Sequence, residues 1–148
     1  MVGSISQVPA SCWLYVSRSQ IEVAAIPSEI EQIVSTSRGR NATLDVTGAL
    51  IFARGRFSQY LEGPETSVAA LRASIERDDR HTDIVTLPTK PTAVRLFEGW
   101  SLAYAGEASY MSRAMERTLV DAIEGPERDV RTLINIMVGM TDGRTPKG

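Results

Sequence analysis

A chain of 148 residues is long enough for one domain with a short appendage. Its hydrophobic fraction of 43% and charged fraction of 23% are ordinary for a globular protein, which excludes disorder of the whole chain. A net charge of −2 offers no electrostatic footprint for nucleic acid or for an anionic membrane, so we expect neither as a partner.

Strand-like and helix-like segments alternate along the chain. Residues 11–17 form an apolar run typical of a buried strand, and residues 27–39 have helical spacing, with Pro27 in the first turn and Gly39 near the end. The turn Arg54-Gly55 indicates a hairpin. The other predicted elements are strands over 45–53 and 56–62, a helix that opens at Gly63-Pro64-Glu65, strands over 83–88 and 99–105, and helices over about 107–123 and 126–139.

This order, β-α-β-β-α-β, is that of the ferredoxin-like α+β fold. Two helices should cover one face of the sheet, an extra strand follows, and the two C-terminal helices should cover the other face. We expect residues 1–10 to be an N-terminal extension, residues 106–140 to hold the C-terminal helical pair, and residues 141–148 to be a flexible tail.

Residues for standard catalysis are scarce. The chain has one histidine, His81, and one cysteine, Cys12, which are too few for a zinc site built from such ligands. The polar surroundings of His81 favour a loop or capping role, and no glycine-rich phosphate loop is present. We therefore expect no catalytic residue and no metal. Because a single cysteine cannot form an internal disulfide and the N-terminus lacks a signal peptide, we expect a cytoplasmic protein.

Uncharged polar residues occupy positions where the pattern calls for apolar ones. Strand alternation places Gln59 on one face with Phe57 and Leu61, and it allows Tyr15 to face inward from the first strand. Asn41 continues the apolar stripe of the first helix. Buried amides and phenols need hydrogen-bond partners, so together they would suit an uncharged polar ring with amide edges. The alternatives are a core tyrosine bonded to a backbone carbonyl, a helix-capping Asn41 and a turn-closing Gln59.

Several sequence blocks resemble the BLUF family, the photoreceptor domains that sense blue light with a flavin. Together they cover roughly residues 11–105, in the family's order and spacing, and the family fold is the ferredoxin-like one. The blocks are Leu14–Arg18, Ser37–Asn41, Val46–Leu50, Gly55–Pro64, Arg77–His81 and Phe97–Ser101.

The resemblance implies a non-covalently bound flavin, usually FAD, between the first and second helices. Tyr15 matches the tyrosine that gives an electron and a proton to the light-excited flavin, and Gln59 matches the glutamine whose rearranged hydrogen bonds redden the absorption. Asn41 matches the asparagine that grips the polar edge of the ring. The side chains that would meet the ribityl or phosphate portion are those of Arg80, Asp78 and Arg40.

Two positions depart from the family pattern. Leu102 stands where methionine commonly follows Trp100-Ser101, which alters the expected relay of the signal through Trp100 and the last strand. Arg40 stands where asparagine or histidine is usual, so FMN or riboflavin is an alternative to FAD. Trp13, two residues before Tyr15, is either a second electron donor or a packing residue.

The expected function is a short, stand-alone blue-light photoreceptor that is not an enzyme. Its signal would pass through the last strand and the C-terminal helices to a separate partner protein, and the chain would form a homo-oligomer. Two alternatives are open. One is a flavin-binding interaction module without a productive photocycle. The other is an acylphosphatase-like hydrolase on the same fold, although Ser17–Gln20 supplies only one arginine and no glycine to an anion-binding loop.

Overall fold

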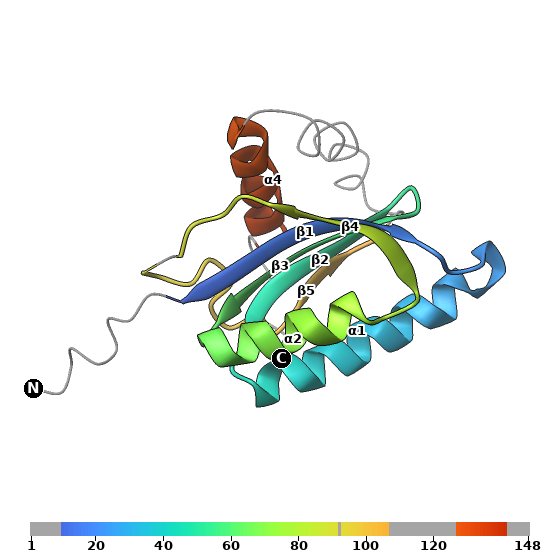
Figure 1. The fold of residues 1–148 in the computed structure, drawn as a ribbon, viewed down its shortest axis with the longest axis horizontal. Coiled ribbons are helices and arrows are strands. Elements are labelled where there is room, and N and C mark those ends of the chain that lie inside the picture. The colour runs from blue at the N-terminus through green and yellow to red at the C-terminus, as the bar shows by residue number, and fades with distance from the viewer. Residues whose placement is uncertain (1–9, 92, 107–126, 142–148) are drawn as a thin grey trace, which may run out of the picture.

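The computed structural model describes residues 10–91, 93–106 and 127–141. Figure 1 shows a five-stranded sheet with α1 and α2 on one face and α4 on the other. The elements in chain order are β1 (Ser11–Ser19), a short 3-10 turn (Val23–Ala25), α1 (Ile26–Thr43), β2 (Thr47–Ala53), β3 (Arg56–Gly63), α2 (Glu65–Glu76), β4 (His81–Leu87), β5 (Ala103–Ala105) and α4 (Glu127–Gly139).

The strands are ordered β4-β1-β3-β2-β5, with antiparallel pairs except for the parallel β2–β5 pair at the edge. β3 therefore lies at the centre of the sheet, and its register sets Gln59 directly across from Tyr15 on β1 and from Leu50 on β2. The Arg54-Gly55 turn has positive φ at both residues, which is the geometry of a tight hairpin. These features confirm the predicted ferredoxin-like α+β arrangement.

Two apolar cores lie on opposite faces of the sheet because successive strand residues alternate. The core beneath α1 and α2 contains Trp13, Tyr15 and Leu61. The core beneath α4 contains Leu14 and Tyr60 from the sheet, together with the buried helix residues Val130, Leu133 and Met137. The C-terminal helix predicted over 126–139 is thus confirmed as the cover of the second face, while the helix predicted over 107–123 lies outside the described residues.

Several predicted boundaries were wrong. α1 continues to Thr43, so Gly39 lies inside the helix and Asn41 is a helical residue, not a cap after Gly39. β5 is much shorter than the predicted strand over 99–105, because the 96–99 segment makes a turn before it. β4 begins at His81, which places that histidine in the sheet and not in a loop.

Neither a membrane-spanning helix nor a cluster of metal-binding side chains occurs among the described residues. None of their helices has the length and apolar character needed to span a bilayer. No group of three or more histidine, cysteine, aspartate or glutamate side chains in the described ranges is arranged to hold a metal ion.

Candidate functional site

A small cavity of about 90 Å³ lies between the sheet, α1 and α2. The helices reach it through side chains of α1 and of the C-terminal part of α2, and the sheet supplies its floor. Its lining residues are Tyr15, Ile33, Thr36, Ser37, Arg40, Leu50, Phe57, Gln59, Ser74, Ile75, Asp78, Arg80 and His81. The cavity thus gathers five of the polar residues singled out from the sequence: Tyr15, Gln59, Arg40, Asp78 and Arg80.

Tyr15 and Gln59 form a buried pair in the floor of the cavity. The Tyr15 hydroxyl donates a hydrogen bond to Gln59 Oε1 over 2.6 Å, and both side chains are at least 95% buried. Burial raises the pKa of the Tyr15 phenol well above its usual range, and the charge of Asp78 raises it further. The phenol therefore keeps its proton at neutral pH. Because Tyr15 occupies Oε1, the amide nitrogen of Gln59 and its two N–H donors are left for a ligand in the cavity.

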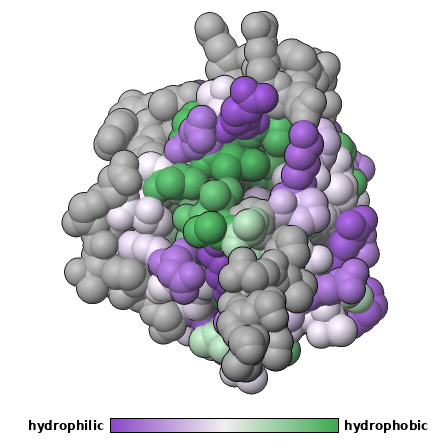
Figure 2. Space-filling view, turned by 90° about the vertical axis from the view of Figure 1, so that its left-hand side faces the viewer, coloured by the Kyte–Doolittle hydropathy of each residue, from purple (hydrophilic) through white to green (hydrophobic). Residues whose placement is uncertain are grey.

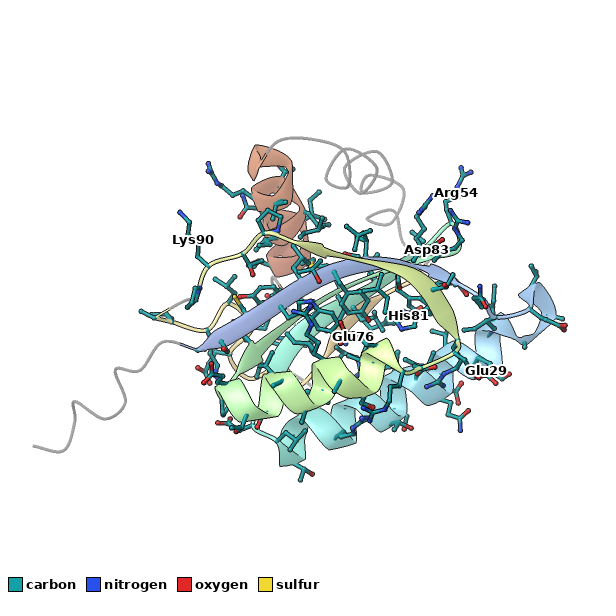
Figure 3. The ribbon with its side chains drawn as sticks, in the orientation of Figure 1. Glu29, Arg54, Glu76, His81, Asp83 and Lys90 are labelled. Carbon is teal, nitrogen blue, oxygen red and sulfur yellow. The ribbon has the colours of Figure 1, made fainter. Side chains whose placement is uncertain are left out.

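His81 stands beside this pair, with its ring edge-on to Tyr15 and centroids 5.9 Å apart. Figure 3 shows its side chain between the sheet and the two helices. Nε2 lies 2.7 Å from the Ile75 carbonyl and Nδ1 lies 2.7 Å from Ser17 Oγ. A carbonyl only accepts, so Nε2 carries a proton. The histidine thus connects the end of α2 to β1, which is a structural role.

Charged side chains border the cavity at the end of α2. Arg80 binds the Asp78 carboxylate in a forked pair, with Nη2 to Oδ2 at 2.6 Å and Nε to Oδ1 at 3.0 Å, and its Nη1 lies 3.7 Å from Glu29 Oε1. The hydrogen bond to Arg80 lowers the pKa of the Asp78 carboxyl. The same bond raises the pKa of Arg80. A guanidinium held in this way keeps its charge at the rim of the cavity.

Arg40 and Asn41 join α1 to its neighbours. Arg40 Nη2 donates to Ser74 Oγ over 2.5 Å, a contact that bridges α1 and α2 at the cavity. Asn41 is buried, and its Nδ2 donates to the Ser101 carbonyl over 2.8 Å, just ahead of β5. Asn41 therefore ties the helix to the segment that carries Trp100 and Leu102.

Trp100 and Leu102 face opposite cores. Trp100 is buried with Phe97 and α4, on the far side of the sheet from the cavity. Leu102 is fully buried in the core beneath α1 and α2, and its carbonyl accepts a hydrogen bond from Arg38 Nε over 3.1 Å. The leucine, not the tryptophan, is thus the member of this segment that shares the core of Tyr15.

Trp13 packs against Tyr15 in a stacked arrangement with ring centroids 4.5 Å apart. Its indole Nε1 donates to Thr86 Oγ1 over 3.0 Å, and the Arg72 guanidinium lies 4.9 Å above its ring. The stacking limits the motion of Tyr15, and the overlying cation disfavours the removal of an electron from the indole.

Comparison with known proteins bears on what this site binds. Residues 11–103 match the family model BLUF, described as sensors of blue-light using FAD. The photoactivated adenylate cyclase subunit beta of Euglena longa is 39% identical over 80 residues, which are 53% of this chain and 9% of that protein. The blue light- and temperature-regulated antirepressor BluF of Escherichia coli (strain K12) is 43% identical over 70 residues, 47% of this chain and 17% of that protein. The match thus covers less than a fifth of either relative.

The fold is shared along most of the chain with solved structures. BlrB, a BLUF protein in its dark state, superposes with a TM-score of 0.77 and 27% identity, covering 90% of this chain and 98% of that one. A bacterial light-regulated adenylyl cyclase gives a TM-score of 0.62 and 26% identity, covering 91% of this chain but 40% of that one. Sequence and fold therefore indicate the same family.

Proposed function

The chain belongs to the BLUF family, whose members bind a flavin, and we propose that it is a blue-light photoreceptor in which Tyr15 and Gln59 form the light-sensitive hydrogen-bond pair. The observation that carries this proposal is the buried Tyr15–Gln59 bond at the floor of a cavity between α1 and α2. A phenol and a carboxamide, isolated from water, are suited to switching hydrogen bonds and poorly suited to hydrolysis.

The residues present fit a flavin. Gln59 has N–H donors free for the carbonyl and ring nitrogen of an isoalloxazine, and Arg80 offers a guanidinium to a phosphate group. The cavity of about 90 Å³ is smaller than the roughly 300–1,000 Å³ usual for cofactor sites, so we propose that α1 and α2 move apart when the flavin binds. FAD is the proposed flavin, with FMN or riboflavin as alternatives. Asn41 is proposed to hold the polar edge of the ring, with Arg40 and Asp78 near its phosphate or ribityl portion.

The flavin supplies the absorption of blue light and the capacity to accept an electron. The contribution of Tyr15 is a phenol that keeps its proton and directs it at Gln59 Oε1. The contribution of Gln59 is an amide that carries donors at one end and an acceptor at the other. Rotation or tautomerisation of this amide exchanges the group that faces the cavity, with no net chemical change in the protein. We propose that this exchange is the signal.

The output is proposed to leave through β5 and the helices that follow it. Leu102 shares the core of Tyr15, and Trp100 shares the core of α4, so the segment before β5 contacts both faces of the sheet. The relatives named above are a photoactivated adenylate cyclase subunit and a blue light-regulated antirepressor, and each is much longer than the segment that matches this chain. For this chain we propose residues 11–105 as the flavin-binding domain, residues 106–140 as its helical appendage, and a separate cytoplasmic partner or a second copy as the receiver. The chain itself is proposed not to be an enzyme.

An absorption spectrum of the flavin-loaded protein, taken before and after blue illumination, tests the proposal. We expect flavin bands that shift reversibly to the red, and Gln59→Leu should abolish the shift. The matched control is Gln32→Leu, on the exposed side of α1, which should shift like the parent. Protein that takes up no flavin would refute the proposal. Flavin bands without a shift would select the interaction module that lacks a photocycle.

A further inference from the structure

Glu62 is a buried carboxylate on the central strand of the sheet. It lies three residues after Gln59 on β3, so alternation directs it to the face beneath α4. It is fully buried, and it accepts three hydrogen bonds: 2.8 Å from Thr47 Oγ1, 2.8 Å from the Leu96 backbone N–H and 2.7 Å from the Phe97 backbone N–H. Two consecutive backbone donors and a hydroxyl replace the hydration that burial removes.

These bonds fasten the turn that carries Trp100. The Phe97 carbonyl accepts a hydrogen bond from the Trp100 backbone N–H over 2.9 Å, and the Trp100 carbonyl accepts one from the Gly48 N–H over 3.1 Å. The turn is thus attached to β3 at one end and to β2 at the other. Because its two ends are fixed, the strand that follows starts in one register, with Trp100 under α4 and Leu102 under α1.

The other polar attachment of this turn is weaker. Arg95 Nη2 lies 3.1 Å from Asp45 Oδ2, but the Asp45 side chain is 75% exposed, and ion pairs in such positions contribute little. Arg95 Nη1 also reaches Thr47 Oγ1 at a longer 3.3 Å. Glu62 is therefore a buried anchor of the turn at Leu96 and Phe97, in addition to the buried Asn41 bond to the Ser101 carbonyl, and it lies on the same strand as Gln59.

We propose that Glu62 is a positioning residue for signalling, whose carboxylate couples β3 to the 96–102 segment and keeps Trp100 and Leu102 on their separate faces. This inference rests on the proposed photoreceptor function. Gln59 lies on the cavity face of β3 and Glu62 on the other, so a shift of β3 that follows rearrangement of Gln59 moves the anchor of the turn. The signal for Glu62 in the sequence is a carboxylate on a strand that pairs on both sides, and it was not among the predicted site residues.

Glu62→Gln removes the charge and replaces one acceptor oxygen with an amide that faces an N–H donor. The matched control is Glu98→Gln, which removes an exposed charge from the same turn. In the flavin-loaded protein in the dark, hydrogen exchange of the Leu96 and Phe97 amides should become about tenfold faster in Glu62→Gln, the effect of one lost charged hydrogen bond. The control should exchange like the parent.

A second readout separates signalling from simple support. The initial red shift should keep its size in Glu62→Gln because Tyr15 and Gln59 are unchanged. The rate of its return in the dark should change by about threefold, the result if half of the lost stabilisation acts on the barrier. A return rate equal to that of the control, despite faster exchange, would show a purely structural role and overturn the proposal.

Thr47→Val tests the same anchor if the Glu62→Gln protein does not fold. It removes one of the three hydrogen bonds and keeps a β-branched residue in β2. It should accelerate exchange at Leu96 and Phe97 by about threefold, less than the glutamine variant, and unchanged exchange there would overturn the anchor. A parent protein that shows no red shift would refute the proposed function, whereas the dark exchange experiment would still decide whether Glu62 holds the turn.

Discussion

The hydrogen bond between Tyr15 and Gln59 should be measurable as a coupling in stability, without light. Tyr15→Phe leaves the buried Gln59 Oε1 without its 2.6 Å partner, and Gln59→Leu leaves the Tyr15 hydroxyl without an acceptor. A buried polar group left unpaired costs about 1–3 kcal/mol. Replacing both partners with apolar groups of similar shape removes the unpaired group, so the double variant should be no less stable than either single variant.

The expected coupling energy between the two positions is at least about 1–3 kcal/mol, and each single variant should melt roughly 2–12 °C lower than the parent. The assays are urea denaturation for the free energies and thermal denaturation for the melting temperatures, both in the dark and followed by circular dichroism, for the parent, both single variants and the double variant. Repeating the denaturation at two flavin concentrations separates the contribution of the hydrogen bond from the stabilisation that bound flavin adds.

The control cycle pairs Tyr15→Phe with Gln32→Leu, whose side chain is exposed on α1. This control should be additive within about 0.5 kcal/mol. If the Tyr15–Gln59 cycle were equally additive, the two side chains would not be hydrogen-bond partners. The proposal that this pair is the light-sensitive element would then lose its basis.

The remaining predictions concern packing and ionisation. Gly48→Ala should destabilise the protein by about 2 kcal/mol or more, because the new Cβ would clash with the Tyr60 backbone carbonyl; an unchanged melting temperature would contradict the close pairing of β2 and β3. Leu133→Ala, fully buried in α4, should cost about 2–5 kcal/mol in chemical denaturation, whereas exposed Arg131→Ala should change stability by less than about 0.5 kcal/mol. Because folding lowers the pKa of Asp78, the stability that its carboxylate contributes is present above its unfolded pKa of about 3.9 and is lost as pH falls through the folded value. Asp78→Asn should therefore lose less stability than the parent between neutral and acid pH. Plots of stability against pH that run parallel for the two proteins would rule this out. Burial raises the pKa of Tyr60, and Cys12 and Glu62 raise it further. The stability that Tyr60 contributes is therefore present below its unfolded pKa of about 10 and falls as pH rises through the folded value. Tyr60→Phe should make the fall in melting temperature at alkaline pH less steep, and an equally steep fall would assign it to other groups.

Strand alternation predicted the inward face of Gln59 and allowed the same face for Tyr15, while their pairing came from the family resemblance. The register places the two residues opposite each other. Local signals were less reliable where tertiary contacts decide. Gly39 suggested the end of α1, but the helix continues to Thr43 as its last turn gains bonds from Arg40 to α2 and from Asn41 to the Ser101 carbonyl.

His81 and Glu62 show why the partners of polar side chains inside the fold escape a pattern of hydrophobicity. His81 is flanked by polar residues, yet its two ring nitrogens find partners on β1 and α2 that lie 64 and 6 residues away in the chain. The partners of Glu62 at Leu96 and Phe97 are more than 30 residues distant. The sequence next to His81 or Glu62 therefore does not show the partners at Ser17, Leu96 and Phe97, because these are brought close only by the fold.

The two-sided burial of β3 constrains how this protein can change over time. All residues from Phe57 to Gly63 are buried, with alternate side chains committed to different cores. A point substitution in β3 can change the packing of one core and leave the packing of the other core unchanged. A single-residue insertion in β3 would exchange the two faces and bring Ser58 or Tyr60 to the place of Gln59. We expect length variation among descendants of this sequence to be confined to turns such as Arg54-Gly55, while β3 changes only by substitution.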